Sequence, residues 1–186
     1  GQLLNWLDVI GAISAHRHCR RVVVTASVGK VAFQKPIKLG DIVTLEAQVS
    51  RAFTSSMEVV MDVWVEDHIT GDKKRHNEAI FTFVAVDQIG RPIEVPELIP
   101  ESDQEKDRFE GALRRRQLNL IMAGKMSAKD AVELKSLFSD LETFNDAVGD
   151  NLAFSILKFF LEISYSNFEI NKLKLFNFAK SKDSLS

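Results

Sequence analysis

The 186-residue sequence is short of several features, and each shortage excludes a class of protein. A single cysteine, Cys19, cannot form an intrachain disulfide, which fits a reducing compartment. A formal net charge of −2 gives no basic face for a nucleic-acid partner. No apolar run approaches the roughly 20 residues that span a bilayer, because even residues 154–163 are interrupted by Lys158 and Glu162. We expect a cytoplasmic protein with no nucleic-acid partner and no membrane span.

Two common catalytic motifs are also missing. The sequence contains no Gly-rich phosphate loop and no Gly-x-Ser-x-Gly nucleophile elbow. Its hydrophobic fraction of 45% and charged fraction of 27% are typical of a globular protein. The length allows one domain of about 100–150 residues and an extension.

Residues 2–16 predict a helix. The segment QLLNWLDVIGAISAH has no breaker near its ends, and its apolar residues cannot all lie on one stripe. Its length favours a helix over a strand. Because a helix that is apolar all round is normally buried, we expect this one inside the core.

Four strands are predicted after this helix. Residues 21–28 are rich in β-branched side chains, and Gly29 and Lys30 then disturb the alternation, which indicates a bulge. Residues 42–50 and 57–65 alternate between apolar and polar side chains, so each strand should have one buried face and one solvent-exposed face. Residues 79–86 are apolar on both faces, as in a central strand. The pattern predicts an α+β fold, with an antiparallel sheet wrapped around a central helix.

The composition changes beyond Pro92. Residues 94–100 should be extended, and residues 104–123 should form a helix. Ser127 to Asp130 resembles a capping box that opens a second helix through Leu141. We therefore expect a helical C-terminal extension over residues 101–145, followed by a tail of unknown role over residues 146–186.

Asp8 is the candidate catalytic residue. It is the only ionisable side chain between Gly1 and Ala15, and a buried carboxylate needs either a partner or a function. Gly11, Ala12 and Ala15 share its helix face, which predicts room for a substrate. Such a carboxylate can act as a general base or as a nucleophile. The helix alone favours the other explanation, a carboxylate that accepts hydrogen bonds across a subunit interface.

A metal site is not expected. His16, His18 and Cys19 form a His-x-His-Cys sequence, but His68 and His76 each stand alone and supply no second group of ligands. Cys19 is also a weak candidate nucleophile, because no His–Asp pair is fixed beside it.

An ordered set of short motifs over residues 1–100 favours a catalytic role for Asp8 over the purely structural explanation. The set consists of GQLLNWLD at 1–8, RH at 17–18, VTASV at 24–28, Phe33 and Pro36, Gly40-Asp41, RAFTSSME at 51–58 and AIFTFVAVD at 79–87. It resembles the acyl-coenzyme A thioesterases of the hotdog superfamily. The branch is that of the broad-specificity bacterial enzymes and the animal cytosolic enzymes with tandem hotdog domains.

The resemblance implies hydrolysis of fatty acyl-CoA to free fatty acid and CoA, within fatty acid metabolism. Asp8 occupies the family's catalytic position, where it activates water or attacks the thioester. The backbone N–H of Gly1, at the start of the helix, polarises the thioester oxygen. Thr54 and Ser55 line the site of the partner subunit, so a homo-oligomer is expected, either a dimer or a trimer of dimers. No cofactor is implied, because CoA is part of the substrate.

The chain departs from the family's pattern at its start. The family has a first strand and an Asn upstream of a Gly-Gly pair, of which only the second Gly is present, as Gly1. We therefore expect a hotdog domain over residues 1–100 without its N-terminal strand. An alternative is a catalytically inactive hotdog that binds acyl-CoA or serves assembly. The residues that bind CoA cannot be assigned, although Lys30, Lys35 and Arg51 are candidates.

Overall fold

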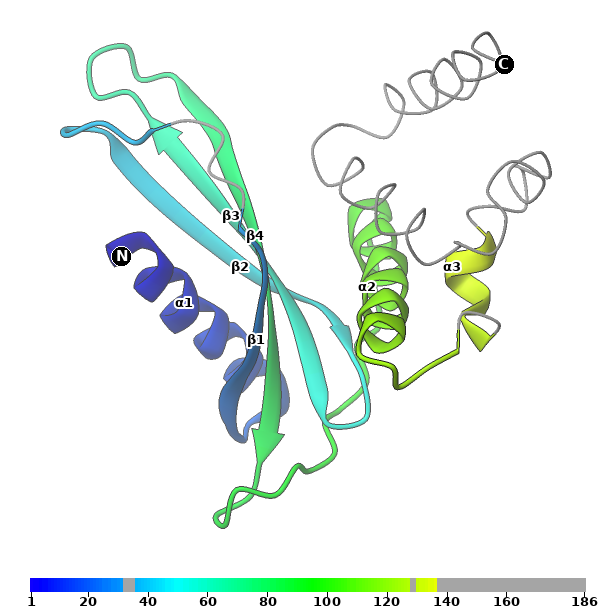
Figure 1. The fold of residues 1–186 in the computed structure, drawn as a ribbon. Coiled ribbons are helices and arrows are strands. Elements are labelled where there is room, and N and C mark those ends of the chain that lie inside the picture. Colours follow the sequence, from blue (N-terminus) through cyan, green and yellow to red (C-terminus); the bar gives the residue numbers. More distant parts are fainter. Residues whose placement is uncertain (32–35, 128–129, 137–186) are drawn as a thin grey trace, which may run out of the picture. The chain divides into compact units, whose positions relative to one another are not determined.

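The computed structural model describes residues 1–31, 36–127 and 130–136, so the predicted tail over 146–186 lies outside the described residues. The chain divides into two compact units, Gly1–Leu113 and a second that begins at Arg114. None of the helices in the described part is long and apolar enough to cross a membrane. The elements, shown in Figure 1, are α1 (Gln2–Cys19), β1 (Val22–Val31), β2 (Ile42–Ala52), β3 (Ser56–Glu66), β4 (Lys73–Val86), α2 (Asp103–Met122) and α3 (Val132–Ser136).

The four strands form one antiparallel sheet in the order β1-β4-β3-β2. Within the described chain, β1 and β2 are therefore the two edges. Helix α1 lies across one face of the sheet, as Figure 1 shows, and its buried residues join the core cluster of the strands. This confirms the predicted α+β hotdog arrangement.

The core lies between α1 and the sheet. Alternation places the odd-numbered residues of β3, and those of β4 from Asn77 onward, on the face toward α1. Phe81, Phe83, Met57 and Met61 are almost completely buried there, together with Leu7 of α1.

Gly11 lets α1 approach the sheet closely. A Cβ atom at this position would lie 2.8 Å from Phe83 Cζ and 3.0 Å from Met61 Sδ. Any larger side chain would force the helix or the ring to move, so glycine sets the separation between α1 and β4.

The prediction that α1 is buried all round is wrong for the single chain. Its buried residues are Leu7, Gly11, Ala15 and Cys19, which recur every four positions on one face. Leu4 and a neighbouring stripe are exposed, with 47% exposure for Trp6, 51% for Val9 and 52% for Ile13. One sheet can cover only one face of a helix, so an apolar face remains on the other side.

Two strand details differ from the prediction. β4 begins at Lys73 rather than at Ala79, because its charged first half pairs with the end of β3, for example Lys73 opposite Glu66. β1 has the expected irregularity at Gly29, where a Cβ would lie only 2.7 Å from the carbonyl oxygen of Ile80. It also has a register shift at Ala26 that the alternation did not indicate.

On β3 the face of the sheet away from α1 is buried, contrary to the prediction, whereas Glu46 and Gln48 on β2 are exposed as predicted. Glu58 and Asp62 on β3 are only 6% and 7% exposed. Asp62 forms ion pairs with Arg75 and with Arg108 of α2, the latter at 2.7 Å, and Glu58 accepts a 2.7 Å hydrogen bond from Ser50 Oγ. Strand alternation marks these residues as polar, but it cannot show that another element will cover them.

Arg51 on β2 provides a second contact between this face and the first half of α2. Its guanidinium carbon lies 3.9 Å from the centre of the Phe109 ring, and Nη1 donates a 3.0 Å hydrogen bond to the Phe109 carbonyl. Arg51 therefore holds the helix by a cation–π contact and a hydrogen bond together.

The capping box predicted at Ser127–Asp130 stays a prediction, because residues 128–129 lie outside the described part; the described helix α3 begins at Val132. In the first turn of α3, Leu134 N–H donates to Gln117 Oε1 at 2.9 Å. A capping box opens α2. There, Ser102 Oγ accepts from Glu105 N–H at 3.2 Å, and Glu105 Oε2 accepts from Ser102 N–H at 2.9 Å. The helix end predicted at Leu141 lies outside the described residues.

Candidate active site

Asp8 lies near the middle of α1, half-buried, with its carboxylate against β1. Thr25 Oγ1 donates a hydrogen bond of 2.7 Å to Asp8 Oδ1. The pairing of Thr25 with Phe83 places Thr25 on the sheet face toward α1. This bond fixes one carboxylate oxygen, while no hydrogen bond to Oδ2 is found among the described residues. The carboxylate is thus oriented and still able to accept a proton.

Sequence reasoning did not assign a role to Thr25. The signal was present, because Thr25 is a polar residue at an inward-facing position of an otherwise apolar strand. The strand loses its regular register directly after Thr25, at Ala26. Bulges of this kind commonly re-aim side chains beside a site.

The small residues beside Asp8 do not have the role that the sequence predicted. Gly11 and Ala15 are buried against the sheet, and the space next to Gly11 is filled by Phe83 and Met61. They allow close packing of the helix and do not line a substrate pocket within this chain. The acyl-binding space predicted on this face of α1 is therefore not provided by Gly11 or Ala15.

Gly1 is the N-cap residue of α1, and its carbonyl accepts the first helical hydrogen bond from Asn5 N–H at 3.3 Å. No side chain caps this helix end, and a Cβ at Gly1 would meet nothing within 4 Å. Such an open helix N-terminus can hold a negatively charged oxygen. Gly1 and Asp8 lie on the same helix, however, where a rise of 1.5 Å per residue separates them by about 10 Å.

Thr54 and Ser55 form the turn between β2 and β3. Their carbonyls accept 3.0 Å hydrogen bonds from the N–H groups of Val95 and Ala85, respectively. In the sheet, β4 lies between this turn and Thr25, so the lateral separation is two strand spacings, or about 9.6 Å. One chain therefore does not bring Thr54 and Ser55 to Asp8, and their predicted place in a partner's site stays a prediction.

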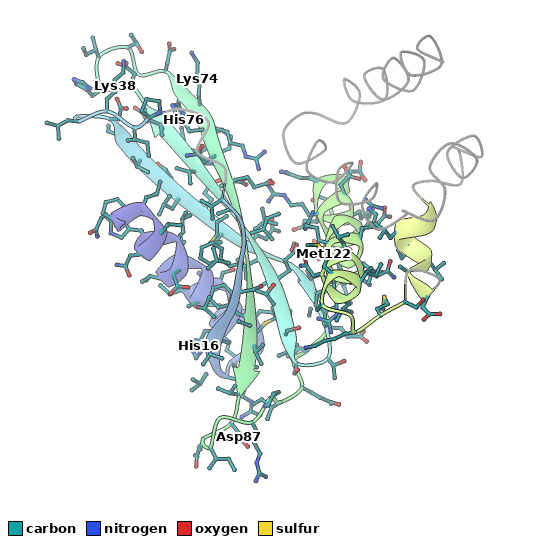
Figure 2. The ribbon with its side chains drawn as sticks, in the orientation of Figure 1. His16, Lys38, Lys74, His76, Asp87 and Met122 are labelled. Carbon is teal, nitrogen blue, oxygen red and sulfur yellow. The ribbon has the colours of Figure 1, made fainter. Side chains whose placement is uncertain are left out.

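The histidines and the cysteine have separate partners. His16 Nδ1 lies 2.7 Å from the Arg21 carbonyl, His18 Nε2 lies 2.8 Å from the Pro96 carbonyl, and the buried Cys19 thiol points to the Arg21 carbonyl at 3.8 Å. Figure 2 shows His16 near one end of the sheet and His76 at the other. Across the described residues, no three potential metal ligands come together.

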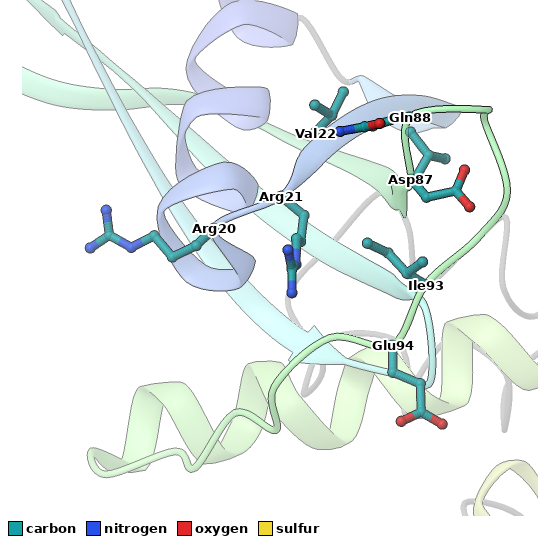
Figure 3. A pocket seen from close by; sticks show the side chains of 8 residues that line it. Arg20, Arg21, Val22, Asp87, Gln88, Ile93 and Glu94 are labelled. Carbon is teal, nitrogen blue, oxygen red and sulfur yellow. The ribbon is translucent and has the colours of Figure 1, made fainter.

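A cavity of about 600 Å³ lies at the C-terminal end of α1, away from Asp8. Arg20 and Arg21 line it together with Val22, Ile93 and Glu94 (Figure 3). Three cationic residues were candidates for binding CoA. Of these, Arg51 packs on the Phe109 ring, and the side chains of Lys30 and Lys35 lie outside the described part.

The sequence matches known thioesterases. A family model described as "Thioesterase superfamily" matches residues 1–71. The uncharacterized acyl-CoA thioester hydrolase YkhA of Bacillus subtilis is 46% identical over 105 residues, which are 56% of this chain and 61% of that protein. The chain therefore spans less than two thirds of the length of this relative.

Solved structures match as well. An apo-hexameric acyl-CoA thioesterase has a TM-score of 0.64 and 35% identity, over 66% of this chain and 79% of that chain. The acyl-CoA hydrolase of Staphylococcus aureus was solved in complex with butyryl-CoA, CoA and CoA disulfide. It has a TM-score of 0.61 and 39% identity, over 73% of this chain and 82% of that chain. These likenesses confirm the resemblance drawn from the sequence motifs.

Proposed function

We propose that this chain, which belongs to the acyl-CoA thioesterases of the thioesterase superfamily, hydrolyses fatty acyl-CoA to free fatty acid and CoA. The names of its relatives support this substrate class. The observation that carries the proposal is the 2.7 Å hydrogen bond from Thr25 to Asp8. It turns an isolated carboxylate into an oriented one, as a general base or nucleophile requires.

Variants of the Staphylococcus aureus enzyme support the same pair. Structures of that enzyme include separate replacements of an aspartate and a threonine by alanine, and these two residues are 17 positions apart. Asp8 and Thr25 are also 17 positions apart, and they are in contact. Thr25 therefore joins Asp8 as a member of the proposed site.

In the proposed reaction, Asp8 takes a proton from a water molecule whose oxygen attacks the thioester carbonyl carbon. The resulting tetrahedral oxyanion is stabilised by a helix N-terminal amide, that of Gly1. The carbon–sulfur bond then breaks, and the proton held by Asp8 neutralises the departing CoA thiolate. The alternative is direct attack by Asp8 to form an acyl-anhydride, which water hydrolyses in a second step. Neither route requires a cofactor, and CoA enters as part of the substrate.

The site is completed by a second copy of the chain. A carbonyl attacked beside Asp8 cannot also contact Gly1 of the same helix, since reacting groups must approach to about 3–3.5 Å. We therefore assign Gly1, Thr54 and Ser55 to the partner's site. The exposed apolar stripe of Trp6, Val9 and Ile13 supports self-association, as does the hexameric state of a structural neighbour. We propose a dimer or a trimer of dimers in the cytoplasm, where the free thiol of Cys19 is stable.

The test compares substitutions at the pair, with medium-chain acyl-CoA as substrate and trapping of the released thiol as the readout. Asp8→Asn should fold as the parent does, by circular dichroism, and lose nearly all turnover. Thr25→Val should lose about 10- to 100-fold in kcat, the worth of one hydrogen bond to a charged group, and Thr25→Ser should keep most of it. Full turnover by Asp8→Asn would refute the assignment. CoA binding without any thiol release by the parent chain would favour the inactive binding module.

A further inference from the structure

We infer that Ala26, an extra residue in β1, is a positioning residue that holds the Thr25 hydroxyl against Asp8. The inference deepens the proposed function and rests on it, since the orientation of Asp8 matters only to a chain in which Asp8 reacts. Ala26 acts through the course of the strand backbone and not through its own side chain. Its presence in the strand is therefore what matters, and its identity is not.

At Ala26, β1 carries one residue more than β4 does. Thr25 lies opposite Phe83 and Ser27 lies opposite Thr82, so two consecutive residues of β4 face two residues of β1 that are not consecutive. Ala26 stands between these two pairs and has no Cα partner in β4. This is the arrangement of a β-bulge, which bends its strand and increases the local twist.

The sheet itself does not need the extra residue. If Ala26 were removed, Thr25 would stay opposite Phe83 and Ser27 would stay opposite Thr82, and the ladder would become regular. Thr25 and Val28 would still both face α1, because only one residue would then separate them. A bulge disrupts the ladder and leaves one residue unpaired. The reason for this one must therefore lie outside the pairing of β1 with β4.

Packing does not explain the bulge either. Ala26 is exposed, so its methyl group adds nothing to the core. The second irregularity of β1 is different, because it includes Gly29, where a Cβ would lie 2.7 Å from the carbonyl oxygen of Ile80. Close approach of two backbones accounts for the irregularity at Gly29, but Ala26 already carries a Cβ and is accommodated.

The distortion is confined to the strand that carries Thr25. On its other side, β4 pairs with β3 in regular register through this region, with Met57 opposite Phe83 and Glu58 opposite Thr82. β1 is an edge of the sheet in the described chain, so it can bend without disturbing a further described strand. The bulge therefore changes the course of β1 directly beside Thr25 and leaves the core strands regular.

The place of the Thr25 hydroxyl follows directly from the place of its backbone. Oγ1 is only two bonds from Cα, and a β-branched side chain has few χ1 choices, so Thr25 cannot compensate for a displaced backbone as a long side chain could. Its hydrogen bond to Asp8 Oδ1 is 2.7 Å long. Such a bond is lost at about 3.6 Å, so a displacement of about 1 Å at Thr25 is enough to break it.

The experiment deletes Ala26 and measures hydrolysis of a medium-chain acyl-CoA. The chain without Ala26 should fold as the parent does, by circular dichroism, and lose about 10- to 100-fold in kcat with little change in KM, as Thr25→Val should. The conservative variant Ala26→Ser keeps the number of residues and should keep the kcat of the parent. A deletion chain that is folded and has the kcat of the parent would overturn the inference. An unfolded deletion chain would also overturn it, because the sheet would then need the residue.

A second comparison tests whether Ala26 acts through Thr25. Thr25→Val should lower kcat in the parent but hardly change it in the chain without Ala26, because the hydrogen bond to Asp8 is already absent there. Two losses in kcat that multiply in the combined variant would overturn the inference.

A crystal structure of the chain without Ala26 separates this inference from the proposed function. The distance from Thr25 Oγ1 to Asp8 Oδ1 should exceed about 3.5 Å in that structure, whether or not the chain hydrolyses thioesters. A distance that stays at 2.7 Å would refute the positioning role of Ala26. A lengthened distance, together with a parent chain that has no thioesterase activity, would refute only the proposed function.

Discussion

Substitution of Gly11 by alanine tests how closely α1 must lie on the sheet. The new Cβ would be 2.8 Å and 2.9 Å from two ring atoms of Phe83, which is itself fully buried. Ordinary carbon contacts begin near 3.4 Å, so the helix or the ring must move by about 0.6 Å. Overpacking of this kind costs about 1–3 kcal/mol, and the better helix propensity of alanine offsets about 1 kcal/mol. We expect a net loss of up to about 2 kcal/mol in the free energy of unfolding.

The cost of Gly11→Ala should fall, or become a gain, when the ring is removed. In a Phe83→Leu background the two ring atoms are absent and the close contact with Met61 Sδ, at 3.0 Å, remains. The same substitution should then cost less than in the parent or stabilise by up to about 1 kcal/mol through helix propensity. The assay is urea unfolding followed by circular dichroism, with protein concentration held fixed because self-association alters apparent stability. A Gly11→Ala effect of the same size and sign in both backgrounds would refute the close-packing argument.

Two further predictions concern charged groups on and near the other face of the sheet. Replacing Asp62 by Asn leaves Arg75 and Arg108 without their shared carboxylate and should cost about 2–3 kcal/mol. By contrast, Lys106→Met breaks only an exposed 3.6 Å pair and should change stability by less than about 0.5 kcal/mol. Equal effects in urea unfolding would contradict this ranking. Backbone N–H groups of Ser102 and Glu101 lower the pKa of Glu105, so its stabilisation is present above the ordinary Glu pKa and is lost as pH falls through the lowered value. The urea midpoint of Glu105→Gln should therefore lie below that of the parent at about pH 7 and approach it at about pH 3, and a constant difference would contradict the linkage.

The local elements were predictable because local patterns determine them. The apolar run of residues 2–16 predicted α1, and the alternation after Ile42 predicted β2 and β3. The first half of β4 was missed because its Lys, Arg and His residues do not alternate with apolar ones. Its strand conformation comes from pairing with β3, which is a tertiary effect that outweighs β-propensity.

The site was predictable only in part. A lone carboxylate in an apolar helix pointed to Asp8, but the sequence does not state which strand residue will lie opposite it. The structure identifies Thr25 as this residue, because β1 lies against α1 and brings Thr25 into hydrogen-bond contact with Asp8. The burial of Glu58 and Asp62 was missed for a related reason, since a sequence pattern shows that a face is polar but not what will cover it.

The two faces of the sheet are held to their helices by different forces. α1 packs on the sheet through apolar contacts with Phe81, Phe83 and Met61. The first half of α2 is held instead by the ion pair of Arg108 with Asp62 and by the cation–π contact of Arg51 with Phe109. Excluded salts such as sulfate strengthen apolar burial, so they should tighten the packing of α1 on the sheet. The Arg108–Asp62 pair is largely buried, and buried pairs are screened only weakly. The ionic composition of the solvent therefore acts mainly on one side of this sheet.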